Sequence, residues 1–204
     1  MHWLLLPLAF LLGSIPFGYL LVRWHTGGDI RRSGSGNIGA TNVLRTAGKK
    51  LGILTLLLDA FKGWLALWLA LHWGQNPAVL VAGCLFLVIV GHMFSPWLRG
   101  HGGKGVATAL GAFMALAPGA LAGAVVVFLI VLAAWRYVSL ASICACSALP
   151  LLLLIPMHAG HIAPVIVAVT AAAMALVVYR HKGNLSRLSQ GTESRLGQGA
   201  GKIA

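Results

Sequence analysis

Long apolar runs constrain the fold of this chain more than any other feature. A helix that crosses a membrane needs about 20 mostly apolar residues, because each residue advances the helix by about 1.5 Å. Runs of about that length are Trp3–Val22, Leu51–Trp73, Ala78–Leu98 and Ala163–Tyr179. We interpret each as a membrane-spanning helix, the first being retained rather than removed as a signal peptide.

The stretch 106–156 is also apolar, but two breaks divide it. Pro118-Gly119 ends a first helix, and Trp135-Arg136-Tyr137 ends a second with aromatic rings beside a cation, as is typical of a membrane interface. The predicted helices are Val106–Leu116, Gly119–Trp135 and Leu140–Ile155. The first is too short to cross a bilayer unaided, so we expect its start to lie inside the protein or the helix to be tilted. Seven spans are predicted in total, with five as the alternative if the short helices are re-entrant.

The basic residues predict how these spans are oriented. With seven spans, one face receives the segments 23–50, 99–105, 136–139 and 180–204, which hold fourteen of the fifteen Lys and Arg residues. The turns on the other face hold none, and Lys62 lies inside a predicted helix. Because cytoplasmic loops carry an excess of Lys and Arg, we expect the N-terminus outside and the C-terminus in the cytoplasm.

Composition agrees with a membrane protein and excludes several other classes. Of the 204 residues, 59% are hydrophobic and only 9% are charged, whereas a soluble domain has about 25% charged residues. The net charge of +12 lies in short loops between apolar runs, so we attribute it to the membrane surface and predict no nucleic-acid partner. All three cysteines lie in apolar runs, which supports neither a disulfide framework nor a metal site.

The predicted fold class is therefore all-α, a polytopic transmembrane helix bundle. We expect residues 1–194 to form one integral-membrane domain and residues 195–204 to form a flexible cytoplasmic tail. Asp59 and Lys62 lie three residues apart in an apolar helix, so we expect them to neutralise each other inside the bundle. His92 is interpreted as a packed histidine near a helix end.

Three segments on the basic face predict a site for anions. Residues 31–45 interleave glycines with Ser, Thr and Asn side chains between arginines, so backbone N–H groups and neutral donors can converge on a phosphate. Residues 100–108 place Lys104 among glycines at the start of a helix, where the helix dipole favours negative charge. Residues 179–193 are basic and rich in donors, and Ser139 and Ser142 add a weaker element.

Several formal motifs fail on context. The glycines at 34, 36 and 39 satisfy GxGxxG, but no strand precedes them, so a dinucleotide fold is rejected. No GxxxxGK[ST] is present, because Gly105 follows Lys104. His158 and His161 have no third ligand nearby, so no metal and no cofactor are predicted.

The same segments resemble the signature motifs of one bacterial family. They read GSGNIGATNVLR (34–45), GHMFS (91–95) with GGKGVAT (102–108), and RHKGN (180–184) with RL (187–188) and GTE (191–193). This combination is similar to the acyl-phosphate:glycerol-3-phosphate acyltransferase family, PlsY. The resemblance extends over nearly the whole chain, including 58–63 and 136–142. His101 departs from the lysine that is common in the family, so that position is not expected to be essential.

The resemblance implies a function. A fatty acyl group would pass from acyl phosphate to the 1-hydroxyl of glycerol 3-phosphate, giving lysophosphatidate and phosphate in the first acylation step of phospholipid synthesis. The expected partners are these two substrates, the lipid bilayer and the enzyme that makes acyl phosphate. The expected location is the bacterial inner membrane, with the site facing the cytoplasm. The chain has no HxxxxD pair, so the mechanism of thioester-dependent acyltransferases is not expected.

The residues expected to act on the substrates come from all the unusual segments. Those predicted to be catalytic are Ser35, Arg45, Lys104, Ser142, His181 and Asn184. Those predicted to bind substrate phosphate are Gly34, Gly36, Asn37, Gly39, Thr41, Asn42, Gly102, Gly103, Gly105, Thr108 and Arg187.

Two other functions are weighed against this one. A transporter or flippase of a phosphorylated solute or lipid would share the basic face, but it should show internal repeats and polar residues throughout the bundle. A phosphatase or phospho-alcohol transferase needs a nucleophilic histidine or several metal-binding acids. The chain has three acidic residues in all, which cannot build such a metal site.

Overall fold

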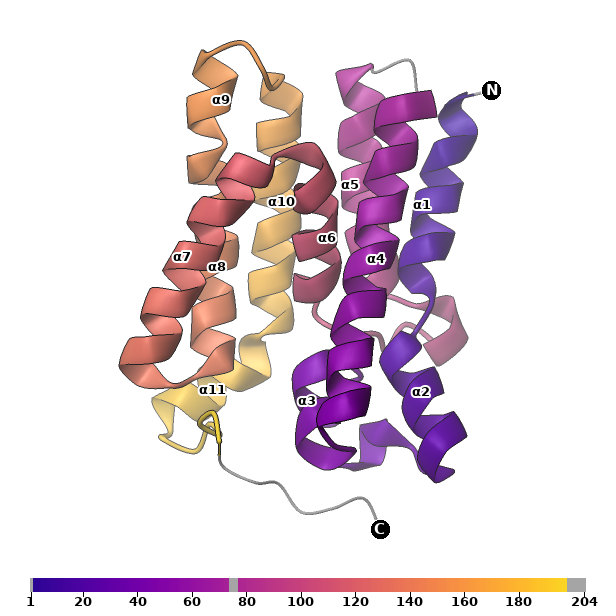
Figure 1. The fold of residues 1–204 in the computed structure, drawn as a ribbon, viewed down its shortest axis with the longest axis vertical. Coiled ribbons are helices and arrows are strands. Elements are labelled where there is room, and N and C mark those ends of the chain that lie inside the picture. Colours follow the sequence, from indigo (N-terminus) through magenta and orange to yellow (C-terminus); the bar gives the residue numbers. More distant parts are fainter. Residues whose placement is uncertain (1, 74–76, 198–204) are drawn as a thin grey trace.

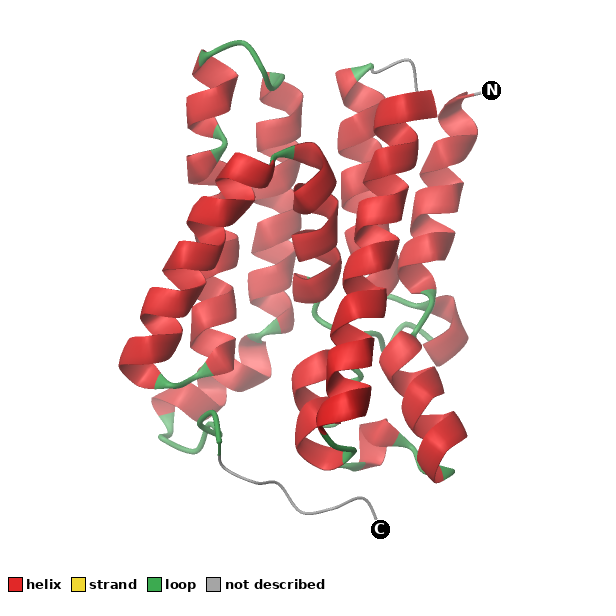
Figure 2. Ribbon diagram, viewed as in Figure 1, coloured by secondary structure: helices red, strands yellow, loops and turns green. Residues whose placement is uncertain are grey.

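The structure is a computed structural model that describes residues 2–73 and 77–197. In this part of the chain every regular element is a helix, and most helices run along the long axis of the molecule (Figures 1 and 2). An all-α bundle was predicted, and this is confirmed. Each apolar run of the sequence corresponds to a helix, although several boundaries and one break differ from the prediction.

The first apolar run is broken in the middle. A short 3-10 helix, His2–Leu4, continues into α1 (Leu5–Ser14), and α2 (Phe17–Thr26) follows after a two-residue gap. The predicted single helix Trp3–Val22 is thus interrupted at Ile15-Pro16. Proline lacks an N–H group and disfavours helical backbone in the residue before it, and Ile15 is accordingly extended, with φ −61° and ψ 116°.

The basic segment after α2 is folded rather than open. It contains a 3-10 turn, Ile30–Arg32, and α3 (Ala40–Thr46), a short helix that the sequence did not reveal. α4 (Lys49–Trp73) then runs along most of the bundle, and α5 (Ala78–Met93), which is shorter, packs against it and ends partway along (Figure 1). α3 packs against the start of α4.

α6 (Val106–Leu116) is a half-length helix that follows a loop with the 3-10 turn Pro96–Leu98. Its 11 residues give a length of about 16 Å, roughly half of a bilayer's hydrocarbon core. Glycines allow α6 to lie against α4 with its backbone in contact. A Cβ atom at Gly111 would lie 1.7 Å from the carbonyl oxygen of Ala60, and one at Gly63 would lie 2.0 Å from that of Thr108.

The rest of the chain forms a second group of helices beside α6 (Figure 1). They are α7 (Pro118–Trp135), α8 (Val138–Leu152), α9 (Leu154–His158), α10 (Pro164–Arg180) and α11 (Lys182–Ser189). α8 ends at Leu152, earlier than predicted, and α11 was not predicted. α10 and α11 meet at an angle of 53° at His181.

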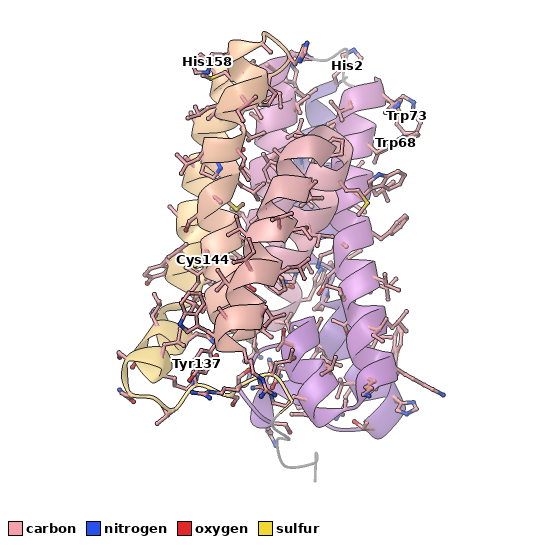
Figure 3. All side chains as sticks on the ribbon, turned by 60° about the vertical axis from the view of Figure 1, so that its left-hand side comes forward. His2, Trp68, Trp73, Tyr137, Cys144 and His158 are labelled. Carbon is pink, nitrogen blue, oxygen red and sulfur yellow. The ribbon has the colours of Figure 1, made fainter. Side chains whose placement is uncertain are left out.

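The number of spans and the orientation stay predictions. Five helical segments of the described chain are long and apolar enough to cross a membrane, or six if α10 and α11 count as one, and α6 is shorter. α2, α3 and α11 lie at one end of the bundle, and the start of α1 and α9 lie at the other (Figure 1). Trp73 and Tyr137 lie toward opposite ends (Figure 3), as expected for side chains at the two membrane interfaces.

The predicted domain boundary at residue 194 also stays a prediction. Of the expected tail, Leu196 is bound to the turn between α7 and α8, since its N–H donates to the carbonyl oxygen of Arg136 at 2.7 Å and its own carbonyl accepts from that guanidinium at 3.0 Å. Residues 198–204 lie outside the described residues.

Candidate active site

One cavity of about 770 Å³ brings together all the segments that the sequence analysis singled out. Its polar part is formed by the loop before α3, α3 itself, the start of α6 and the region from His181 to Leu196. The remaining lining comes from α4 and the later part of α6, from α7 and α8, and from His92 of α5. The cavity therefore lies between the two groups of helices and reaches the end of the bundle that carries the basic loops.

The loop before α3 owes its shape to Asn42. The Asn42 side-chain oxygen accepts from the N–H of Ser35 at 2.9 Å, and its amide nitrogen donates to the carbonyl oxygens of Ser33 and Asn37 at 3.0 and 2.8 Å. Gly34, with φ +58°, makes this possible, since a Cβ atom there would lie 2.3 Å from the Asn42 oxygen. The Asn42 side chain was predicted to bind phosphate, but its polar atoms hold the loop instead.

Three side chains of this region remain available to a ligand. Ser35, Thr41 and Arg45 line the cavity, and within the described chain no hydrogen bond or ion pair engages their side chains. Arg45 lies in the last turn of α3, so the short helix positions its guanidinium. A planar guanidinium can bind two phosphate oxygens at once.

Lys104 supplies the second cation. Gly102 and Gly103 fold back on the end of α5, where their N–H groups donate to the carbonyl oxygens of Met93 and His92 at 3.1 and 3.0 Å. Lys104 is the next residue, and its ammonium donates to the side-chain oxygen of Asn184. Burial, opposed by Glu193 and reinforced by the neighbouring arginines, lowers the pKa of Lys104 to about 8. An anion that entered the cavity would relieve this concentration of positive charge.

Glu193 organises the third segment, although it was not among the predicted site residues. Its Oε1 accepts from Ser139 and from the Asn184 amide, each at 2.7 Å, and its Oε2 accepts from Arg187 at 2.7 Å. Burial opposes ionisation, but these hydrogen bonds outweigh it and hold the pKa of Glu193 below its usual value. The carboxylate thereby fixes Asn184, which in turn accepts from Lys104.

His181 is held in a single neutral form. Its Nδ1 lies 2.8 Å from the carbonyl oxygen of Val177, which can only accept, so Nδ1 carries the proton and Nε2 has a free lone pair. Burial, together with the positive charge of Lys104, lowers the pKa of His181 to about 4. At neutral pH this imidazole is an acceptor of hydrogen bonds and a weak base.

Ser142 contributes an oxygen rather than a free hydroxyl hydrogen. Its hydroxyl donates to the carbonyl oxygen of Val138 at 2.8 Å, one turn earlier in α8. Because it lines the cavity, its oxygen lone pairs can still accept from a ligand.

The remaining wall of the cavity is apolar. It is formed mainly by Leu110 of α6, by Leu121, Val125, Phe128 and Leu129 of α7, and by Ala145 and Leu149 of α8. This wall was not predicted, because its residues resemble every other apolar residue of the spans. The cavity therefore combines a cationic, donor-rich part with a hydrocarbon surface.

Most of the predicted site residues meet in this cavity. All six predicted catalytic residues line it, as do Gly34, Asn37, Gly39, Thr41, Asn42, Gly105 and Arg187. Gly36, Gly102, Gly103 and Thr108 are not part of its lining. Gly36 forms a turn with φ +70°, and Gly102 and Gly103 pack against His92. Thr108 is fully buried, and its hydroxyl has no partner within the described chain.

No group of three or more His, Cys, Asp and Glu side chains in the described part of the chain could hold a metal ion. The acidic residue nearest to the cations, Glu193, is already engaged through both of its oxygens.

Comparison with known proteins identifies close relatives. Residues 3–191 match the family model described as glycerol-3-phosphate acyltransferase. The chain is 45% identical over 193 residues to the glycerol-3-phosphate acyltransferase of Syntrophotalea carbinolica, covering 95% of this chain and 96% of the relative. It is 48% identical over 188 residues to that of Trichlorobacter lovleyi, covering 92% and 93%.

Two solved structures have a similar fold. Both are crystal structures of PlsY (YgiH), described as an integral membrane glycerol 3-phosphate acyltransferase. The glycerol 3-phosphate form superposes with a TM-score of 0.87 at 38% identity, covering 96% of each chain. The lysophosphatidic acid form gives 0.84 at 36% identity, covering 96% of this chain and 95% of the other.

Proposed function

This chain belongs to the glycerol-3-phosphate acyltransferase family, and from that premise we propose that it takes its acyl group from acyl phosphate. The acceptor is the 1-hydroxyl of glycerol 3-phosphate, and the products are lysophosphatidate and inorganic phosphate. The observation that carries this proposal is the composition of the cavity wall. Cations and donors occupy one part, and a hydrocarbon surface built from α6, α7 and α8 occupies the other.

The chemistry of both substrates matches this wall. Each carries a phosphate, and Arg45, Lys104 and Arg187 line the cavity as cations. The donor also carries a long apolar chain, which the α7 and α8 residues would cover. A transporter or flippase of a phosphorylated solute, the alternative considered from the sequence, is not supported by the family to which the chain belongs.

Direct attack of the glycerol hydroxyl on the acyl carbonyl is the simplest step. Acyl phosphate is a mixed anhydride, so phosphate leaves readily, and no side chain need be acylated first. Cys146 lies in the apolar wall, and within the described chain no hydrogen bond connects it to a basic side chain. Arg45, Lys104 and backbone N–H groups would hold the phosphate and stabilise the negative charge that develops as it departs.

The proton of the attacking hydroxyl needs an acceptor. A hydrogen bond from Arg31 holds the pKa of Asp29 at about 2, and Asp29 does not line the cavity. Glu193 accepts from Ser139, Asn184 and Arg187, and the pKa of His181 is about 4. The second pKa of a phosphate monoester is about 6, and the donor's phosphate becomes more basic as its bond to the acyl carbon breaks, so we assign the base to that phosphate.

The basic end of the bundle would face the cytoplasm, in a bacterial inner membrane. The support for this orientation is the distribution of Lys and Arg along the sequence, since fourteen of the fifteen lie in the segments predicted to face the cytoplasm. Glycerol 3-phosphate would enter from the water, and the acyl donor from the membrane.

Purified protein tests the donor directly. It is incubated with glycerol 3-phosphate and either an acyl phosphate or an acyl thioester of the same chain length, and lysophosphatidate is measured. We expect product with acyl phosphate only. Product from the thioester alone would refute the assignment of the donor, and acylation of the 2-hydroxyl would refute that of the acceptor atom.

A further inference from the structure

A cluster of three ionisable side chains lies buried in the middle of the bundle, where two of them, Asp59 and His92, also line the cavity. Asp59 and Lys62 of α4 and His92 of α5 are 1%, 2% and 4% exposed. Charged side chains at such a depth are costly, and they persist only where they are paired or serve a function. Lys62 was expected to neutralise Asp59, but its contacts extend beyond that pair.

The Lys62 ammonium joins three segments of the chain. It lies 2.8 Å from Oδ1 of Asp59, donates to the carbonyl oxygen of Ile15 at 2.8 Å, and lies 2.9 Å from Nδ1 of His92. Ile15 is the extended residue at the break between α1 and α2. An ammonium has three N–H donors and no acceptor, so Nδ1 of His92 accepts and the His92 proton is on Nε2.

His92 in turn supports the loop that carries Lys104. Its backbone carbonyl accepts from the N–H of Gly103, and its ring packs so tightly against that residue that a Cβ atom on Gly103 would lie 2.1 Å from Nε2. The orientation of the ring is fixed by the hydrogen bond to Lys62. The position of Gly103 is thereby tied to α4.

Two further contacts hold the same loop to the same break. The Ser95 hydroxyl donates to the carbonyl oxygen of Ser14 at 2.6 Å, and the Trp97 indole donates to the Ser14 hydroxyl at 2.8 Å. On the opposite side, Arg180 donates to the carbonyl oxygen of Gly102 at 2.9 Å. The loop 94–105 is thus bound directly to α1 and α10, and through His92 to α4, before it delivers Lys104 to the cavity.

We propose that Asp59, Lys62 and His92 are positioning residues that set the place of Lys104 in the active site. Lys62 holds His92, and His92 holds the Gly102-Gly103 backbone immediately before Lys104. Asp59 neutralises Lys62, so that the ammonium can remain charged in an apolar bundle. The inference rests on the proposed function only in that Lys104 binds a phosphate.

An ion pair that only stabilises the fold and a cluster that positions Lys104 predict different effects when the charges are removed. Replacing both members of a buried pair by neutral side chains of similar size often leaves stability unchanged, whereas removing one member strands a buried charge. The double variant Asp59→Asn/Lys62→Met therefore removes the charges together, and with them the contacts of Lys62 to Ile15 and His92. If the ion pair only stabilises the fold, this variant should keep its activity. If the cluster positions Lys104, this variant should lose activity.

A second, matched pair of variants changes only the acceptor. In His92→Asn the amide oxygen can replace Nδ1 as the acceptor for Lys62, whereas in His92→Leu the acceptor is lost. Thermal unfolding of the detergent-solubilised proteins shows whether each variant is folded. Lysophosphatidate formation over a range of pH then gives kcat/KM and the pH above which activity falls, which reports the environment of Lys104.

We expect the double variant and His92→Leu to be folded but to lose about ten- to hundred-fold in kcat/KM, as is typical when a catalytic group is displaced by about 1 Å. Their activity should fall at a higher pH than in the wild type, because a displaced Lys104 is less buried. His92→Asn should retain most of the activity. Wild-type kcat/KM and pH dependence in the double variant would overturn the proposal, as would equal defects in His92→Asn and His92→Leu.

Failure of both the double variant and His92→Leu to fold would also overturn the proposal, because the cluster would then determine the fold rather than the site. The identity of the acyl donor is tested separately, with the wild-type protein. If acyl phosphate proved not to be the donor, the variants would be compared with whichever donor supports acylation of glycerol 3-phosphate.

Discussion

The charge of Lys104 should set the upper pH limit of activity. Its pKa of about 8 lies well below that of an ordinary lysine, because the ammonium is buried among arginines. About nine-tenths of the side chain is charged at pH 7 and about one-tenth at pH 9, so kcat/KM should fall about tenfold between these values and tenfold again by pH 10. The sign follows from the chemistry, since only the protonated amine attracts phosphate.

Lys104→Arg provides the matched variant. A guanidinium stays charged to above pH 12, so the fall in kcat/KM near pH 8 should disappear even if the absolute activity is lower. Bound phosphate favours the charged amine, so in the wild-type enzyme the fall in kcat should occur at a higher pH than the fall in kcat/KM. Both profiles are measured as lysophosphatidate formed, because acyl phosphate hydrolyses in base and would release phosphate without the enzyme. A wild-type profile that stays flat to pH 10, or the same fall in Lys104→Arg, would refute the reasoning.

Further variants test the roles of individual cavity residues and the orientation of the chain in the membrane. Arg45→Ala should remove a charge-assisted phosphate contact of about 1.5–3 kcal/mol and so lower kcat/KM about ten- to hundred-fold. His101→Ala should have little effect on kcat/KM, because the exposed His101 ring contacts only a backbone carbonyl. Equal losses in the two variants would contradict this expectation. His181→Ala should act mainly through KM, because a histidine with a pKa near 4 accepts a hydrogen bond but is a poor base, and a loss beyond about 10⁴-fold in kcat would assign it the proton transfer instead. A cysteine placed at Ala159 should be labelled from outside intact cells, whereas a cysteine placed at Gln190 should not. Labelling of both would rule out the proposed orientation.

Much of the fold follows from features that the sequence displays openly. Apolar runs with proline, glycine or aromatic-cation breaks marked nearly every helix, because a bilayer leaves few other arrangements for such runs. The break at Ile15-Pro16 was missed because a proline within an apolar run does not by itself show whether the helix bends or stops. α3 and α11 are short and partly polar, so no periodicity distinguished them from loops.

The site was predictable to a similar degree, and for a physical reason. Residues that bind an anion are chemically unusual in an apolar chain, so Arg45, Lys104 and His181 were recognisable as candidates. Residues that only hold these anion-binding side chains in place were not recognisable from the sequence. Glu193 belonged to a signature segment but was not among the predicted site residues, because only the fold shows that Ser139, Asn184 and Arg187 surround it. Its role depends on contacts over up to 54 residues of sequence, which no local pattern encodes.

The apolar wall of the cavity has a consequence for how the enzyme must be assayed. Val125 and Leu129 of α7 line the cavity, yet they are 37% and 55% exposed on the surface of the bundle. A donor that reaches the site past this wall arrives by diffusion within the lipid. Its effective concentration is then its mole fraction in the bilayer or micelle, not its amount per litre of buffer. Adding inert lipid or detergent at a constant quantity of acyl phosphate should therefore slow the reaction by surface dilution, while the dependence on glycerol 3-phosphate stays that of a solute in water.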